Sequence, residues 1–146
     1  MSTSKEMEAP ASVAPEFVLF VHPNGRRATL CCTLRDVSLL VILMGRWAKL
    51  IILLEHARVE DQQIPKLPQA LRGFRQAPDL ARRCEENRAV DPPAATTITH
   101  YMSRLCRRLV RPDGDASQFP PLIERIKNTG ARLLHPVKII YLGDKP

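Results

Sequence analysis

The four cysteines of the chain show none of the spacings that metal sites or disulfide frameworks use. Cys31, Cys32, Cys84 and Cys106 form neither a Cys-x-x-Cys pair nor a regular series. This pattern argues against a structural zinc site and against a small disulfide-stabilised secreted fold. We therefore expect reduced, partly buried thiols, which are typical of a cytosolic protein, and no bound metal.

Groupings of catalytic side chains are missing as well. His22, His56, His100 and His135 are dispersed along the chain, and no cysteine or carboxylate stands beside them at ligand or catalytic spacing. The sequence also has no glycine-rich loop of the kind that cradles a phosphate. An enzyme is therefore not expected, no residue is assigned a catalytic role, and no cofactor is predicted.

Membrane-directed segments are a third absence. The N-terminus has no apolar core behind a positive charge, so it does not read as a secretory signal. The most apolar run, residues 37–54, is interrupted by Gly45, Arg46 and Lys49 and is too short and too charged to span a bilayer. The sequence therefore predicts no membrane partner and a cytoplasmic location.

Carboxylates are missing between Asp91 and Asp113, although the whole chain has 15 Asp and Glu against 22 Lys and Arg, a net charge of +7. Apolar residues in this acid-free stretch recur at the spacing of one buried helical stripe, which predicts an amphipathic helix over about 94–110. A solvated helix face usually mixes charge signs, so an outward face with cations alone favours a polyanionic partner. The alternative is a surface helix whose arginines are merely solvated. The candidate contact residues are Thr96, Thr97, His100, Ser103, Arg104, Arg107, Arg108 and Arg111.

A second basic element follows at about 122–134. Asn128, Thr129 and Gly130 form a turn signal between two short apolar runs, which predicts a β-hairpin. Three cations surround its tip: Arg125, Lys127 and Arg132. Residues 97–138 contain eight Lys or Arg against three Asp or Glu, so five of the seven net positive charges fall in this span.

The rest of the chain fits a single domain, residues 17–142, between a flexible tail (1–16) and a frayed end (143–146). The sequence from Thr33 to Asp36 has the form of a capping box, so a helix is expected to start near Leu34 and to bury Leu39, Leu40, Leu43 and Met44. Trp47, Leu50, Ile51 and Leu54 continue the pattern, and Gly45-Arg46 either divides it into two helices or lies within one long helix. The other expected elements are an N-terminal hairpin (17–21 with 28–32), two short helices (69–76 and 78–87) and a last strand (137–142).

With these elements assigned, the chain resembles the OmpR/PhoB-type winged-helix DNA-binding domain of bacterial transcription regulators, without the receiver domain that precedes it in response regulators. Residues 32–43 (Cys-Thr-Leu-Arg-Asp-Val-Ser-Leu-Leu-Val-Ile-Leu) are similar to the family's first-helix pattern. Residues 97–109 (Thr-Ile-Thr-His-Tyr-Met-Ser-Arg-Leu-Cys-Arg-Arg-Leu) are similar to its recognition helix, and residues 123–133 to its wing. Cys106 replaces the family's arginine, Ala131 its tyrosine and Asn128 its first glycine.

The resemblance implies an α+β fold, a winged helix-turn-helix with N-terminal antiparallel strands, three or more helices and a C-terminal β-hairpin wing. It implies a sequence-specific regulator that binds double-stranded DNA in the bacterial nucleoid. The helix at about 94–110 would enter the major groove, and the wing would lie on the backbone or in the minor groove. Wing contacts would come from Arg125, Lys127, Asn128, Thr129 and Arg132.

Two other interpretations remain open at this point. Similar family members bind tandem half-sites as dimers, so a homodimer is compatible with the resemblance. The alternative function is a protein-interaction module with a winged-helix fold that acts on RNA polymerase or another regulator. The span 45–88, which matches nothing in the family pattern, could serve such a partner.

Overall fold

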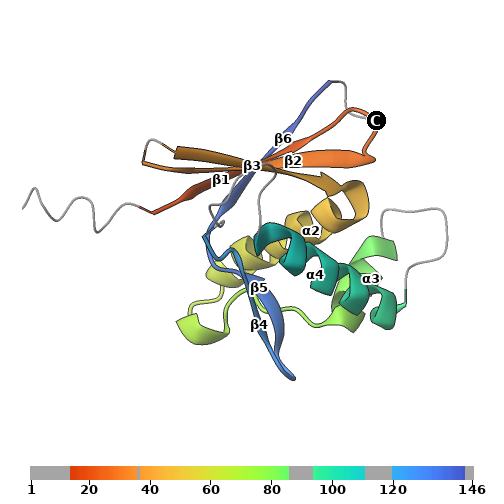
Figure 1. Cartoon of the computed structure of the whole chain (residues 1–146). Coiled ribbons are helices and arrows are strands. Elements are labelled where there is room, and N and C mark those ends of the chain that lie inside the picture. The colour runs from red at the N-terminus through yellow and green to blue at the C-terminus, as the bar shows by residue number, and fades with distance from the viewer. Residues whose placement is uncertain (1–13, 36, 86–93, 111–119, 144–146) are drawn as a thin grey trace, which may run out of the picture.

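The computed structural model describes residues 14–35, 37–85, 94–110 and 120–143 and shows a mixed α+β protein (Figure 1). In this part of the chain, strands come first, three α-helices follow, and an antiparallel hairpin lies near the C-terminus. The elements are β1 (Glu16–Val21), β2 (Arg27–Leu34), β3 (Val37–Met44), α2 (Gly45–Gln62), the short 3-10 helix η1 (Gln69–Leu71), α3 (Ala77–Glu85), α4 (Ala95–Val110), β4 (Ile123–Ile126), β5 (Gly130–Leu133) and β6 (Val137–Tyr141).

The N-terminal strands form a four-stranded sheet in the order β3-β2-β1-β6. Strands β1 and β2 are antiparallel, with Phe17 opposite Cys32, so the predicted N-terminal hairpin is confirmed. The predicted last strand is also confirmed: β6 joins the same sheet parallel to β1, with Phe17 opposite Val137. Segments from near both ends of the chain are thereby joined in one sheet.

The helix predicted to start near Leu34 is wrong. Residues 37–44 form β3, which pairs with β2 along its whole length, and Arg35 lies in the turn between them with φ 56°. Leu39, Val41 and Leu43 are buried while Leu40 is half exposed, which is the two-residue alternation of a strand. The proposed cap residue Asp36 lies outside the described residues. The first of the three motif matches therefore does not correspond to a helix.

Helix α2 starts at Gly45, where the chain needs a glycine. A Cβ on Gly45 would collide with the carbonyl oxygen of Gly25, and the Gly45 amide donates to the Arg26 carbonyl at 2.7 Å. The middle of the helix, residues 50–54, is buried on all sides because it is central: Leu50, Ile51 and Leu54 are at most 1% exposed. It contacts all four strands of the sheet as well as α3, α4 and β5.

The segment after α2 differs in part from its prediction. The helix expected over 69–76 is reduced to η1, and the chain then turns at residues 72–73 before Arg75. The helix expected over 78–87 is present as α3, with Pro78 and Asp79 in its first turn. The predicted tail (1–16) and frayed end (143–146) fall largely outside the described residues, although Glu16 already pairs in β1. None of the described helices is both long enough and apolar enough to cross a membrane.

Candidate functional site

Helix α4 buries the stripe that the sequence predicts. Ile98, Met102, Leu105 and Leu109 are between 0 and 7% exposed and belong to the core shared with α2 and α3. Because about 100° separates successive helical residues, the opposite side must face outward. The predicted orientation is confirmed: Thr96, His100, Arg104 and Arg107 are on the outward side, and Ser103 is half buried.

The remaining α4 candidates lie at the margins of this outward face. Thr97 and Arg108 are at its edges, and Arg111 lies outside the described residues. The first turn of α4 has no acidic residue, whereas Arg107 and Arg108 lie in its last turn. Cations at that end are stabilised by the helix dipole, so the basic character of the face does not oppose helix formation.

The C-terminal hairpin is present as predicted, with β4 and β5 paired from Ile123–Leu133 to Ile126–Gly130. Its turn is closed by the Thr129 amide, which donates to the Ile126 carbonyl at 3.0 Å. Asn128 at the tip has φ 66°, a conformation that asparagine tolerates better than most residues. Lys127 and Asn128 are exposed and Thr129 is half buried.

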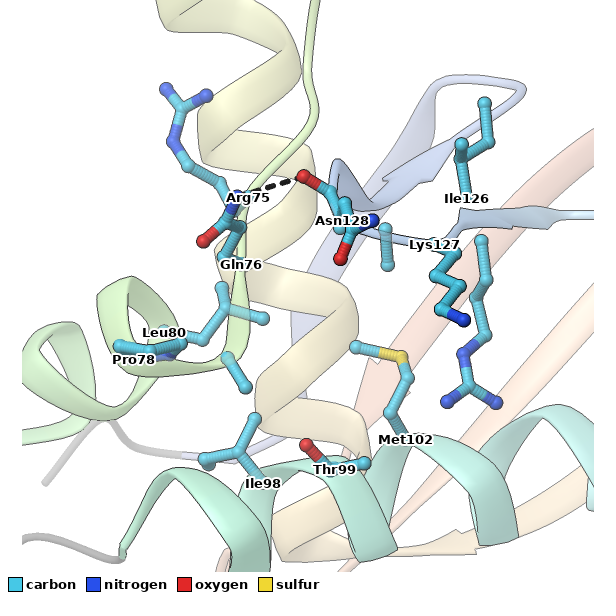
Figure 2. Close-up of a pocket in the computed structure, with 14 residues that line it drawn as sticks. Arg75, Gln76, Pro78, Leu80, Ile98, Thr99, Met102, Ile126, Lys127 and Asn128 are labelled. Carbon is cyan, nitrogen blue, oxygen red and sulfur yellow. Dashed lines mark hydrogen bonds between the residues drawn. The ribbon is translucent and has the colours of Figure 1, made fainter.

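Arg75 fixes the hairpin to the helical layer. Its amide donates to the Ala131 carbonyl at 2.9 Å, and the Ala131 amide donates back at 3.0 Å, so residue 75 adds one position of a third strand to β5. Gln76 Nε2 donates to the Asn128 carbonyl oxygen at 3.1 Å and holds the tip (Figure 2). The hairpin is therefore attached at its middle and near its tip.

A groove of about 450 Å³ separates the hairpin from α4 and the start of α3. Leu80, Ile98 and Met102 line its apolar part, and Figure 2 shows Lys127 on the hairpin and Met102 on α4 among the residues that line it. Arg125 also lines the groove, whose described lining contains no Asp or Glu. The structure thus brings the cations of the hairpin and one flank of α4 to the same depression.

Cys106 lies where α4 meets the hairpin. Burial raises the pKa of its thiol, while nearby Arg125, which interacts with the sulfur, opposes that rise. The thiol is therefore protonated at neutral pH and a poor nucleophile. This contact places β4 alongside the Thr99–Cys106 flank of α4.

Arg132 does not belong to the cationic surface to which the sequence assigned it. Its Nε donates to Glu124 at 2.9 Å, its Nη1 reaches the carbonyl oxygens of Gln69, Ala70 and Arg72 at 3.2 Å each, and its guanidinium stacks on Phe74 at 4.5 Å. Since these partners occupy the guanidinium, Arg132 holds the η1 segment against the hairpin. The candidate surface therefore consists of the outward face of α4, with Arg104 and Arg107, and of Arg125 and Lys127 on the hairpin, without Arg132.

Sequence reasoning missed the ion pair that supports the site. Asp61, 6% exposed, accepts from Arg75 Nη1 and Nη2 at 3.0 Å each and from the Gly73 amide at 2.7 Å. The hydrogen bonds from Arg75 are the largest cause of a lowered pKa for Asp61. Asp61 lies in the last turn of α2, where a negative charge is unfavourable because it opposes the helix dipole. This position was the signal in the sequence that Asp61 has a buried cationic partner.

Within the described ranges, no three His, Cys, Asp or Glu side chains form a group that could hold a metal ion. Comparison of the chain with models of protein families, with curated proteins and with solved structures found no match.

Proposed function

We propose that this protein is a sequence-specific regulator of transcription that binds double-stranded DNA as a winged helix, with α4 in the major groove and the β4–β5 hairpin as the wing. One observation carries the proposal. Arg125 and Lys127 of the hairpin line a groove whose α4 side is formed by Ile98, Thr99 and Met102, and no described carboxylate lines it. The exposed side of the same helix carries Arg104 and Arg107. A duplex presents a phosphate charge about every 1.7 Å, so a cationic surface of this kind suits it.

The dimensions and chemistry of α4 are compatible with this role. The helix has 16 residues, so it is about 24 Å long, and the major groove admits an α-helix. In the proposed complex, Arg104 and Arg107 approach guanine edges or phosphates, with Arg107 at a base edge, and His100 and Ser103 add shorter hydrogen bonds. Arg125 and Lys127 on the hairpin neutralise phosphates or enter a minor groove.

Two substitutions test this division of roles. A binding selection from random duplexes at physiological salt first defines a preferred site. We then expect Arg107→Ala to reduce the preference for that site over random duplex by about 10-fold or more, because a bidentate base contact contributes about 1–3 kcal/mol of discrimination. Lys127→Ala should weaken both duplexes to the same degree. Equal losses from both variants on both duplexes would refute the proposed assignment.

The second candidate is a protein-interaction module that acts on RNA polymerase or another regulator. The observation that favours it is an exposed apolar row on β3. Leu40, Ile42 and Met44 are 40–50% exposed and share one face of the strand, and contiguous apolar surface marks interaction sites. A salt titration separates the two functions. Loss of duplex affinity with rising salt, together with a preferred sequence, supports the first, while absence of duplex binding supports the second.

A further inference from the structure

A second hollow lies on the flank of α4 that faces away from the hairpin. It has a volume of about 300 Å³, and its described lining is Trp47 from the first turn of α2 with Arg104, Arg107 and Arg108 from α4. At about 100° per residue, Arg108 is on the opposite side of α4 from Cys106, which contacts the hairpin. The guanidinium of Arg46 over the Tyr101 ring, at 5.3 Å, also joins the start of α2 to α4.

The indole of Trp47, which lines this hollow, has an unsatisfied donor. Its Nε1 is buried and has no hydrogen-bond partner, a state that costs about 1–3 kcal/mol for a buried polar group. An indole N–H can only donate, so the missing partner must be an acceptor. Since the other described lining residues are arginines, that acceptor is expected to be an anion.

The position of the hollow indicates which anion. Arg107 is on the outward face of α4 and also lines the hollow, so the two surfaces are continuous. A helix in the major groove has one phosphate backbone along each flank, and the hairpin lies on the other flank. Arginine binds phosphate oxygens in a bidentate manner, and an indole N–H can donate to a third oxygen.

We propose that this hollow binds a backbone phosphate of the duplex on the side of α4 remote from the hairpin, with Trp47 Nε1 and Arg104 as its donors. The assignment rests on the proposed DNA-binding function and extends it. Trp47 contributes a neutral hydrogen bond and Arg104 contributes charge, so their substitutions have different signatures.

The test uses the full chain and its single tryptophan, whose emission reports directly on the hollow. Duplex of the selected sequence is added to the protein, and binding is followed by anisotropy of labelled duplex and by Trp47 emission. Trp47→Phe keeps an aromatic ring but removes the donor, so duplex affinity should fall about 10-fold with an unchanged salt slope. Arg104→Gln should weaken binding and make the salt slope shallower by about 0.9.

Lys138→Gln is the control, because Lys138 is an exposed cation on β6, in the sheet. This variant should leave both affinity and the Trp47 emission change as in the wild type. Circular dichroism of each variant excludes unfolding as a cause of weaker binding. A separate titration with inorganic phosphate alone asks whether the hollow takes a free anion instead.

The outcomes separate the inference from the proposed function. Duplex binding with unchanged Trp47 emission and with full affinity of Trp47→Phe would overturn the inference and leave the proposed function intact. An emission change with inorganic phosphate but none with duplex would also overturn it. Absence of any duplex binding by the wild type would refute the proposed function and the inference together. Duplex-dependent emission with the two predicted signatures would support both.

Discussion

Within the described part of the chain, Asp61 is the only charged residue that is buried. Its partner Arg75 is 14% exposed at the side chain and reaches Glu60 and Asp79 in addition. The pair joins the end of α2 to the segment that carries the hairpin bridge, because the Arg75 backbone pairs with Ala131. One ion pair thereby connects the core helix to the candidate surface.

Removal of Asp61 should destabilise the protein. Asp61→Ala leaves the Arg75 charge without its main partner in a poorly hydrated position, and loss of one member of a buried pair typically costs about 3–5 kcal/mol. Urea unfolding at pH 7 measures the change. Glu60→Gln is the control, since Glu60 is 51% exposed and exposed pairs contribute about 0–1 kcal/mol. Equal effects of the two substitutions would contradict the structural role of Asp61.

The same pair predicts a pH dependence. The pKa of Asp61 is lowered in the folded protein, first by the hydrogen bonds from Arg75. A carboxyl group with a lowered pKa stabilises the folded state above its unfolded pKa of about 3.9, and this contribution is lost as the pH falls below that value. The unfolding free energy should therefore decrease below about pH 4, and less steeply in Asp61→Asn. Parallel profiles for the wild type and this variant would exclude Asp61 as the cause.

Arg132 and Lys127 should differ in what their loss affects. Arg132→Lys loses the planar group that donates to Glu124 and to three carbonyls, so unfolding free energy should fall by about 1–3 kcal/mol. Lys127→Ala, at an exposed tip, should change stability by less than about 0.5 kcal/mol and weaken duplex binding. Thermal unfolding and duplex affinity, measured on both variants, decide between a supporting and a contacting role.

At the scale of elements, the hairpin depends on close contact with residue 75. Gly130 has φ 114°, and a Cβ there would collide with the carbonyl oxygen of Arg75. The same contact carries the two hydrogen bonds between Arg75 and Ala131. The position of the hairpin relative to α4 is therefore set by a backbone contact that only glycine allows.

Gly130→Ala should separate the hairpin from the Arg75 segment. Strain from the positive φ alone costs about 1–3 kcal/mol, and the collision adds to it, so we expect a loss of at least about 2 kcal/mol together with weaker duplex binding. Gly25→Ala is the matched control: Gly25 has φ 72° but no atom within 4 Å of the added Cβ. Calorimetry of both variants tests the difference. Equal stability of the Gly130→Ala and Gly25→Ala variants would contradict a close contact at Arg75.

At the scale of the whole molecule, charge is distributed unequally between the layers. Figure 1 shows the sheet on one side of α2 and the hairpin on the other. The cations of the candidate surface, Arg104, Arg107, Arg125 and Lys127, lie on α4 and the hairpin, whereas β3 has no charged residue. The helical layer is thus suited to a polyanion and the edge of the sheet is not.

This arrangement predicts the salt dependence of duplex binding. Three phosphate contacts, from Arg104, Arg125 and Lys127, give a slope of about −2.7 in a plot of log affinity against log salt concentration. Affinity should therefore fall roughly 40-fold between about 50 and 200 mM salt. Anisotropy titrations over that range measure the slope. A slope near zero would refute electrostatic binding through this surface and favour the protein-interaction module.

Local patterns were sufficient for α4, the N-terminal hairpin and the C-terminal hairpin. The apolar stripe of α4 recurs with the period of a helix, so it forms one buried side: Ile98, Met102, Leu105 and Leu109. The turn at Asn128–Gly130 depends only on the backbone conformations of its own residues. The outward orientation of His100 and Arg107 follows from the same period. These features depend on neighbours in the sequence, which is why the sequence could predict them.

The tertiary structure decided what local patterns left ambiguous. Residues 37–44 are apolar enough for a helix or a strand, and pairing with β2 made them a strand. The sequence showed that Arg132 and Lys127 are cations near one turn. Only the fold showed that three carbonyl oxygens and Glu124 hold one of them while the other remains exposed. The physical reason is that burial and ion pairing are set by residues distant in the chain, such as Asp61 with Arg75, and no local period encodes them.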